Sequence, residues 1–310
     1  MTDYPKKPGF VEPRIAEDLT RHMHQSTVSK VFGASSCLAQ YKYLYIDGYR
    51  SPPAVALQFG TAWDRLQYGV PGKTPAHKDT PETRSGYFHE KLTRGVDLPE
   101  KDVKERFAET WKEEAAVIDN WEGEDYVDLQ KRGLLAIGEW HKIAQDIEPR
   151  SLHDDLALEI NGGEWFLRGS LDMIGRHRGE KKFTPRDAKT SGKKWPKGKS
   201  DNMIQATHYS ILLAHTPGYE DVDHNKFTFE VMVKNKQKPV VDEFVTTVDD
   251  RERTTHLRRV ALARDVIHTA FKTGDFIPNR DSMLACSRKL CAFWALCEKE
   301  HGGTVRGEEV

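Results

Sequence analysis

The stretch EWFLRGSLDMIGRHRGEKKFTPRDAKTSG, residues 164–192, contains two predicted strands joined by a turn. The strands are expected over 164–175 and 182–190, because the intervening RHRGE is rich in turn-forming residues. A third strand is expected over 155–160, ahead of the turn-forming NGG. Together these segments predict a three-stranded meander.

Carboxylates and a lysine lie on two of these strands. Asp172 follows Gly169, which permits close backbone approach. Asp187 and Lys189 are two positions apart, so on a strand their side chains point to the same face. If the strands pair as a hairpin, Asp172 comes near Asp187, and the two acids repel each other unless a cation neutralises them. Hard oxygen ligands of this kind favour Mg²⁺ or Mn²⁺. Solvated charges near a turn remain the alternative for these three residues alone.

The same region is strongly basic. Between Arg176 and Lys199 there are ten Lys or Arg residues, against only Glu180 and Asp187. Such a run suits contact with a nucleic-acid backbone, and an aromatic ring within it suits base stacking. A solubilising loop is the alternative. The residues predicted to bind DNA are Lys193, Lys194, Trp195 and Lys197.

The elements outside the meander alternate between helix and strand. Apolar spacing and turn signals predict helices over 14–32, 57–68, 99–120, 125–147, 201–216 and 249–273, and strands over 225–234 and 239–247. Residues 71–98 lack periodicity and are expected to form a loop. This order predicts an α/β or α+β fold with a mixed sheet flanked by helices.

Composition restricts the class of protein. The 310 residues are 37% hydrophobic and 31% charged, as in a folded globular chain, and the net charge of −1 excludes a globally basic nucleic-acid binder. No apolar run reaches the roughly 18 residues that a membrane span needs. The N-terminal residues resemble neither a signal nor a transit peptide. We therefore expect no membrane association and a cytoplasmic location.

The four cysteines are unevenly placed. Cys286, Cys291 and Cys297 lie close together, and Cys37 lies far upstream. In a reducing compartment structural disulfides are not expected, so four thiols favour tetrahedral ligation of zinc or of an iron–sulfur cluster. Cysteines that pack as small apolar residues are the alternative. Spacing alone does not choose between the two kinds of centre.

The ordered set of motifs resembles the RecB-like branch of the PD-(D/E)XK nuclease superfamily, of the AddB and CRISPR-adaptation type. Its signature is matched by Glu159, Gly169-x-x-Asp172, Asp187-Ala-Lys189 and Gln205-x-x-x-Tyr209. Upstream, the family pattern is matched by Ser29, Cys37, Tyr41, Tyr43 and Gly60-x-x-x-Asp64. The resemblance runs from about Ser29 to Cys297. One departure is Asp64, which stands where the family usually has a metal-binding histidine.

The resemblance implies a restriction-endonuclease-like core and a role for each matched residue. It implies one nuclease domain over 1–310, with a mainly helical part over 14–150, a catalytic core over 151–275, a cysteine cluster over 276–300 that closes onto Cys37, and a flexible tail over 301–310. It places Mg²⁺ or Mn²⁺ on Asp64, Asp172, Asp187 and the backbone carbonyl of Ala188. It places Lys189 at the attacking water, Gln205 and Tyr209 as organising residues, and Glu159 as a supporting acid.

The resemblance also favours a 4Fe–4S cluster over zinc. One ligand upstream and three near the C-terminus is the arrangement of the iron–sulfur members, and GDFIPN before the cluster is similar to theirs. Cys291-x5-Cys297 fits that pattern, whereas Cys286-x4-Cys291 departs from the usual two intervening residues. The implied ligands are Cys37, Cys286, Cys291 and Cys297.

The function that the resemblance implies is a metal-dependent exonuclease. Its expected substrates are DNA ends, single-stranded DNA above all, in recombination, repair or phage DNA metabolism. The sequence contains no G-x-x-x-x-G-K-[S/T], so unwinding of a duplex would require a helicase or recombination partner. Two alternatives stay open: a nuclease that trims CRISPR spacer precursors, and a catalytically weakened DNA-end-binding subunit, which Asp64 favours.

Overall fold

The computed structural model describes residues 4–69, 88–93, 98–235, 238–282, 286–288 and 290–302. The chain divides into two compact units. The first comprises Met1–Pro52, Ala157–Gly169 and Asp250–Val310, and the second comprises Pro53–Leu156 and Ser170–Asp249. The expected tail over 301–310 lies, from residue 303 on, outside the described residues. A single nuclease domain stays a prediction.

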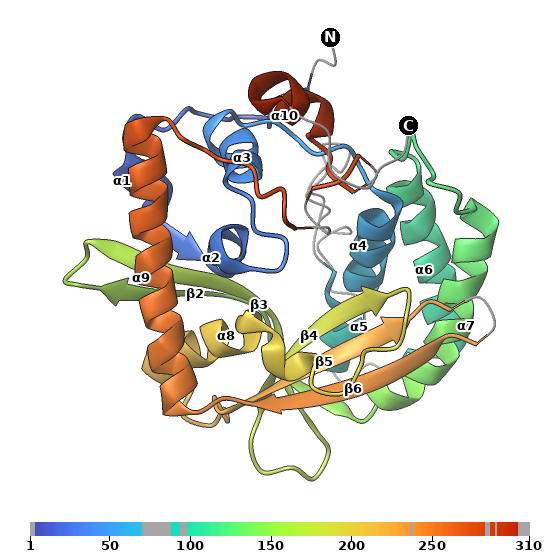
Figure 1. Cartoon of the computed structure of the whole chain (residues 1–310). Helices are drawn as coiled ribbons and strands as arrows, with labels where there is room; N and C mark the ends of the chain where they lie inside the picture. Colours follow the sequence, from blue (N-terminus) through green and yellow to red (C-terminus); the bar gives the residue numbers. More distant parts are fainter. Residues whose placement is uncertain are drawn as a thin grey trace. The chain divides into compact units, whose positions relative to one another are not determined.

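Six strands in the described part of the chain form one mixed sheet (Figure 1). They are β1 (His22–His24), β2 (Ile147–Ile160), β3 (Trp165–His177), β4 (Thr184–Ser191), β5 (Lys226–Val233) and β6 (Val240–Thr247). The strand order is β1-β3-β4-β5-β6, and β2 pairs with β3. The pairs β3–β4 and β5–β6 are antiparallel, whereas β1–β3 and β4–β5 are parallel. The predicted mixed α/β fold is therefore confirmed.

In the second unit, helices cover both faces of the sheet. They are α4 (Val55–Tyr68), α5 (Phe88–Thr93), α6 (Glu100–Ala115), α7 (Tyr126–Ala144) and α8 (Ile204–His215). Alternation along β5 separates the faces. Met232 packs into a buried cluster with residues of α4, α6 and α7, whereas the ring of Phe227 stacks on Tyr209 of α8 at 5.9 Å.

The first unit contains the remaining helices. They are α1 (Ala16–Thr20), α2 (Gln25–Phe32), α3 (Leu38–Tyr41), which continues into a π-helical turn over Lys42–Ile46, α9 (Asp250–Thr273) and α10 (Trp294–His301). One buried cluster joins Tyr41 to Ile267 and Ala270 of α9. A second joins Tyr43 to Phe293 and to three of the four cysteines.

The predicted elements differ from the structure in several places, and the helix predicted over 99–120 ends early, at Ala115. The expected helix over 14–32 is wrong as a continuous element, because β1 interrupts it to pair in parallel with residues 166–168 of β3. The helix expected to end at 147 ends at Ala144, and β2 begins at Ile147, well before the predicted 155. The predicted loop over 71–98 lies mostly outside the described residues, but Phe88–Thr93 within it is helical.

None of the described helices has both the length and the apolar character that a membrane-spanning helix requires.

Candidate active site

Strand β4 carries the acidic and basic pair predicted from its sequence. Asp187 is buried, at 3% exposure. Its Oδ2 forms an ion pair with Lys189 Nζ, which the period of two places on the same face of the strand. Its Oδ1 accepts a hydrogen bond from Gln205 Nε2 of α8 at 2.5 Å. The carboxylate is therefore held from two elements.

Asp172 joins this pair through the register of the neighbouring strand. In the antiparallel β3–β4 pair, Met173 lies opposite Arg186. One step further along, the same register sets Asp172 opposite Asp187. Burial raises the pKa of Asp172 well above its usual value, and the nearby carboxylates of Asp187 and Asp64 raise it further. The predicted convergence of the two acids is thus present in the structure.

Lys189 stays protonated in these surroundings. Burial by itself would lower the pKa of its ammonium group, but the carboxylates of Asp187, Asp172 and Asp64 outweigh this effect and leave the pKa raised. Three carboxylates near one lysine carry an excess of negative charge. A buried site of this charge favours a cation.

Asp64 reaches the site from helix α4. Gly60, one turn earlier on the same helix face, lies against β4, where an added Cβ would stand 3.3 Å from Thr190 Oγ1. The spacing Gly60-x-x-x-Asp64 therefore combines a close helix–strand contact with a carboxylate one turn away. The electrostatic influence of Asp64 on both Asp172 and Lys189 shows that it is their neighbour.

The remaining predicted site residues occupy different places. Tyr209, one turn after Gln205 on α8, donates its hydroxyl hydrogen to the carbonyl oxygen of Ser170 on β3. The side chain of Ala188 packs against the core on the other face of β4. Glu159 lies on β2 within the first unit, beside Gly163, whereas the other residues predicted for the nuclease site belong to the second unit.

The basic loop follows directly after β4. Lys193, Lys194 and Lys197 are exposed there, as expected of residues that contact a DNA backbone. Trp195 differs from the expectation. Its ring is only 6% exposed and packs against Phe229 and Phe244 at 5.7 and 5.5 Å. Because that ring is buried, the base-stacking role predicted for it is wrong; it fastens the loop to the sheet.

The four cysteines gather within the first unit, and all of them are free thiols. Burial raises the pKa of Cys297 to about 11, and the neighbouring thiols of Cys37, Cys291 and Cys286 contribute to this rise. Gln40 Nε2 donates a hydrogen bond to Cys291 Sγ at 3.3 Å. Cys297 therefore has Cys37, far upstream in the sequence, among its neighbours, and a shared centre of the four cysteines stays a prediction.

Neither set of ligands is arranged as a finished metal site. Among the described residues, no three His, Cys, Asp or Glu side chains stand where they could hold a metal ion. The donor chemistry nevertheless fits: carboxylates with an excess of negative charge suit Mg²⁺ or Mn²⁺, and clustered thiols suit iron or zinc. In the structure, Asp187 Oδ2 has Lys189 Nζ as its ion-pair partner.

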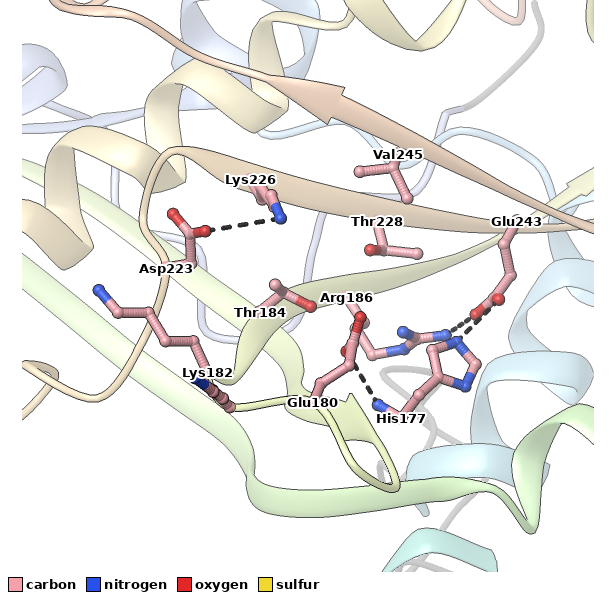
Figure 2. A pocket seen from close by; sticks show the side chains of 11 residues that line it. His177, Glu180, Lys182, Thr184, Arg186, Asp223, Lys226, Thr228, Glu243 and Val245 are labelled. Carbon is pink, nitrogen blue, oxygen red and sulfur yellow. Dashed lines mark hydrogen bonds and ion pairs between the residues drawn. The ribbon is translucent and has the colours of Figure 1, made fainter.

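Sequence reasoning missed an ionic network on the opposite face of β4. It lines a cavity of 380 Å³ and is centred on Arg186, Glu243 and His177 (Figure 2). The one signal in the sequence was an arginine directly before Asp187 in a predicted strand. Its partners lie on strands that are distant in the sequence.

One comparison with known proteins identifies the family of the chain. The profile of the PD-(D/E)XK nuclease superfamily matches residues 25–298. A search of curated proteins finds no significant match. Among solved structures, the chain is similar to a candidate exonuclease from Eubacterium rectale, with 14% identity, a TM-score of 0.45 and coverage of 95% of this chain and 92% of the other. It is also similar to the protein SSO0001, with 12% identity, a TM-score of 0.37 and coverage of 96% and 91%. At these scores neither structure supports an inference about this chain.

Proposed function

Because the chain belongs to the PD-(D/E)XK nuclease superfamily, we propose that it is a metal-dependent exonuclease that hydrolyses phosphodiester bonds at DNA ends. Membership of the superfamily supports nuclease activity in general. The observation that carries the finer proposal is the convergence of Asp172, Asp187 and Lys189 on two adjacent strands, with Asp64 nearby. This is the donor set that a divalent cation and an attacking water require.

The metal would be held by oxygen ligands. We assign Asp64, Asp172, Asp187 and the backbone carbonyl of Ala188 to Mg²⁺ or Mn²⁺. When bound, such an ion polarises the phosphoryl oxygen and lowers the pKa of a water molecule. Burial raises the pKa of Asp172, and repulsion by the carboxylates of Asp187 and Asp64 raises it further; a bound cation would relieve this repulsion.

Residues of the chain supply orientation and charge. Protonated Lys189 donates hydrogen bonds, so it can orient the attacking water and stabilise negative charge that develops on the phosphate. Gln205 fixes the rotation of the Asp187 carboxylate through its 2.5 Å hydrogen bond. Tyr209 ties α8 to β3 through the Ser170 carbonyl. Glu159 remains a proposed supporting acid.

The exposed lysines after β4 support DNA as the substrate. Lys193, Lys194 and Lys197 would contact the phosphate backbone beside the catalytic strand. We propose single-stranded ends as the preferred substrate, with a helicase or recombination partner supplying strands from a duplex. Recombination, repair or phage DNA metabolism in the cytoplasm is the proposed context, and trimming of CRISPR spacer precursors is the alternative.

We further propose that Cys37, Cys286, Cys291 and Cys297 hold a 4Fe–4S cluster, with zinc as the alternative. The influence of the other three thiols on Cys297 supports ligation by all four. A hydrogen bond from Gln40 to Cys291 is of the kind that stabilises a thiolate ligand. Ligation would close the long chain segment between Cys37 and Cys286 and serve a structural role.

One observation favours a second candidate function. Asp64 stands at the position where the resemblance expects histidine, and an altered ligand would suit a DNA-end-binding subunit with weakened chemistry. The complete set of Asp172, Asp187, Lys189, Gln205 and Tyr209 favours the active enzyme.

The test is an anaerobic assay on 5′- and 3′-labelled single- and double-stranded DNA. We expect wild-type protein to degrade single strands from an end with Mg²⁺ or Mn²⁺ and to be inactive with a chelator. Lys189→Ala is expected to abolish degradation while its circular dichroism spectrum stays that of the wild type. Tight DNA binding without cleavage under every metal condition would instead support the end-binding function.

A further inference from the structure

A buried arginine lies directly beside Asp187 in the sequence, on the opposite face of β4. Arg186 is 2% exposed. Successive residues of a strand point to opposite faces, so the Arg186 side chain points away from the carboxylates of the candidate active site. It faces the cavity shown in Figure 2.

The guanidinium group of Arg186 links three strands. It forms an ion pair with Glu243 of β6. Its Nη2 lies 3.9 Å from Glu230 Oε2 on β5, and Glu230 in turn accepts a hydrogen bond of 2.6 Å from Trp140 Nε1 of α7. Glu230 is 2% exposed; burial raises the pKa of its carboxyl group, whereas Arg186 and the hydrogen bond from Trp140 favour its charged form.

The network extends to the fourth strand. Glu243 Oε2 lies 2.9 Å from His177 Nε2 at the end of β3 (Figure 2). His177 Nδ1 lies 2.8 Å from Asp146 Oδ2, just before β2. Side chains from β3, β4, β5 and β6 are therefore joined behind the candidate active site.

A buried network of ion pairs adds little net free energy of folding, and its main use is to fix the register of the strands that it joins. A slip of β4 by one residue would exchange its two faces. Arg186 would then face the carboxyl groups of Asp172 and Asp64 in place of a metal ion, and Asp187 would face Glu230 and Glu243, where like charges would repel each other. We propose that Arg186 is a positioning residue, which holds Asp187 and Lys189 on the active face by fixing the register of β4. This inference rests on the proposed nuclease function.

The test compares two ways of removing the arginine. Arg186→Met leaves Glu230 and Glu243 unpaired and is expected to lower the Tm. The charge-balanced variant Arg186→Met/Glu230→Gln/Glu243→Gln is expected to regain most of the Tm. The charge-balanced variant should still show kcat reduced 10- to 100-fold, with KM for single-stranded DNA near the wild-type value. Titration calorimetry should show Mn²⁺ binding weakened about 10-fold. Losses of this size are usual when a residue that supports metal ligands is removed.

Lys226→Met is the matched control. Lys226 lines the same cavity, and its Nζ lies 3.9 Å from Asp223 Oδ2, but its side chain is 53% exposed. The substitution should therefore change neither kcat nor Mn²⁺ binding. Wild-type kcat and Mn²⁺ affinity in the charge-balanced variant would overturn the proposal and leave Arg186 a structural residue.

If the charge-balanced variant does not fold, Arg186→Gln decides the question. Glutamine stays polar but loses both the charge and the planar fork that pair with Glu230 and Glu243, so wild-type kcat and Mn²⁺ affinity there would equally overturn the proposal. Failure of the proposed function is distinguishable, because it appears in the wild-type protein as absent cleavage. Weaker Mn²⁺ binding in the charge-balanced variant would still support the positioning role in that case.

Discussion

At the residue scale, the two oxygens of Asp187 have different partners. Lys189 of the same strand takes Oδ2, and Gln205 of α8 takes Oδ1. Because the partners come from two elements, rotation of the carboxylate is restricted before any ligand binds. Preorganisation of this kind governs how well a site holds a metal.

Gln205→Leu should therefore weaken the metal site. Removal of the hydrogen bond to Asp187 is expected to reduce Mn²⁺ affinity and metal-dependent DNA cleavage by about 10- to 100-fold. Titration calorimetry and a cleavage assay measure both quantities. Gln25→Leu is the control, since Gln25 Nε2 donates a hydrogen bond of 2.7 Å to Ser29 Oγ within α2. Equal Mn²⁺ affinity in Gln205→Leu and wild type would contradict the role assigned to Gln205.

His89 gives the stability a predictable pH dependence. Burial, together with the nearby Arg186, lowers its pKa to about 3, and neither ring nitrogen has a hydrogen-bond partner among the described residues. The unfolded chain binds this proton below about pH 6.5. The stability that neutral His89 contributes is thus complete above about pH 6.5 and is lost as the pH falls toward 3.

His89→Phe should reduce this loss. The wild-type free energy of unfolding is expected to fall by about 2 kcal/mol between pH 6.5 and 5 on account of His89 alone. Urea unfolding at both pH values measures the difference, which should shrink by that amount in His89→Phe. Phe88→Leu, which alters packing without a titrating group, should destabilise equally at both values. An unchanged pH dependence in His89→Phe would refute the assignment.

At the element scale, Trp195 anchors the loop after β4 to the sheet. Trp195 is buried against Phe229 and Phe244, and Lys199 Nζ lies 4.4 Å from the centroid of its ring system. The neighbouring lysines stay exposed. The tryptophan thus fixes where the loop leaves the sheet, and the lysines determine what the loop can bind.

A triple substitution of Lys193, Lys194 and Lys197 by Ala tests this surface. Loss of three phosphate contacts should weaken binding of single-stranded DNA and reduce the slope of log K against log salt by about 2. Fluorescence anisotropy at several salt concentrations measures the slope. A triple substitution of the exposed Lys101, Lys112 and Lys131 should leave it unchanged. Equal slopes for the two variants would show that the loop does not contact DNA.

The elements that local patterns determine could be predicted, whereas those that depend on distant partners could not. Alternation placed Asp187 and Lys189 on one face of β4, and helical spacing placed Gln205 and Tyr209 on one face of α8. The three residues of β1 form a strand only because they pair with β3, far along the chain. Local periodicity does not contain that information.

The Arg186 network was beyond prediction for the same reason. Its acidic partners come from β5 and β6, and β5 pairs with β4 in parallel after an intervening helix. Trp195 was misjudged because an aromatic residue among lysines looks the same in sequence whether its ring is exposed or packed. Only the position of Phe229 and Phe244 distinguishes the two cases.

At the scale of the whole molecule, two candidate centres lie in separate compact units. The carboxylates and Lys189 belong to the second unit, and the four cysteines belong to the first. Loss of the proposed cysteine centre should therefore act on the structure of the first unit and leave the proposed ligands of the divalent metal in place.

Protein purified without oxygen should be brown and absorb near about 400 nm. Iron and sulfide analysis should give a 4Fe–4S content, and Cys297→Ser should lose both the colour and the iron. Leu290→Ala, whose side chain is 59% exposed and lies in the segment between Cys286 and Cys291, is the control. Colourless wild-type protein with stoichiometric zinc would contradict the cluster.

The measurement that tests the central claim most directly is Mn²⁺-dependent cleavage of end-labelled single-stranded DNA by wild type and Asp187→Asn. Asparagine keeps the shape of the side chain and an oxygen for Gln205, but it removes the charge that a cation requires. We predict that Asp187→Asn folds as the wild type does, binds DNA, and shows neither cleavage nor Mn²⁺ binding. Cleavage by Asp187→Asn at the wild-type rate would contradict the claim that this carboxylate belongs to a metal-dependent nuclease site.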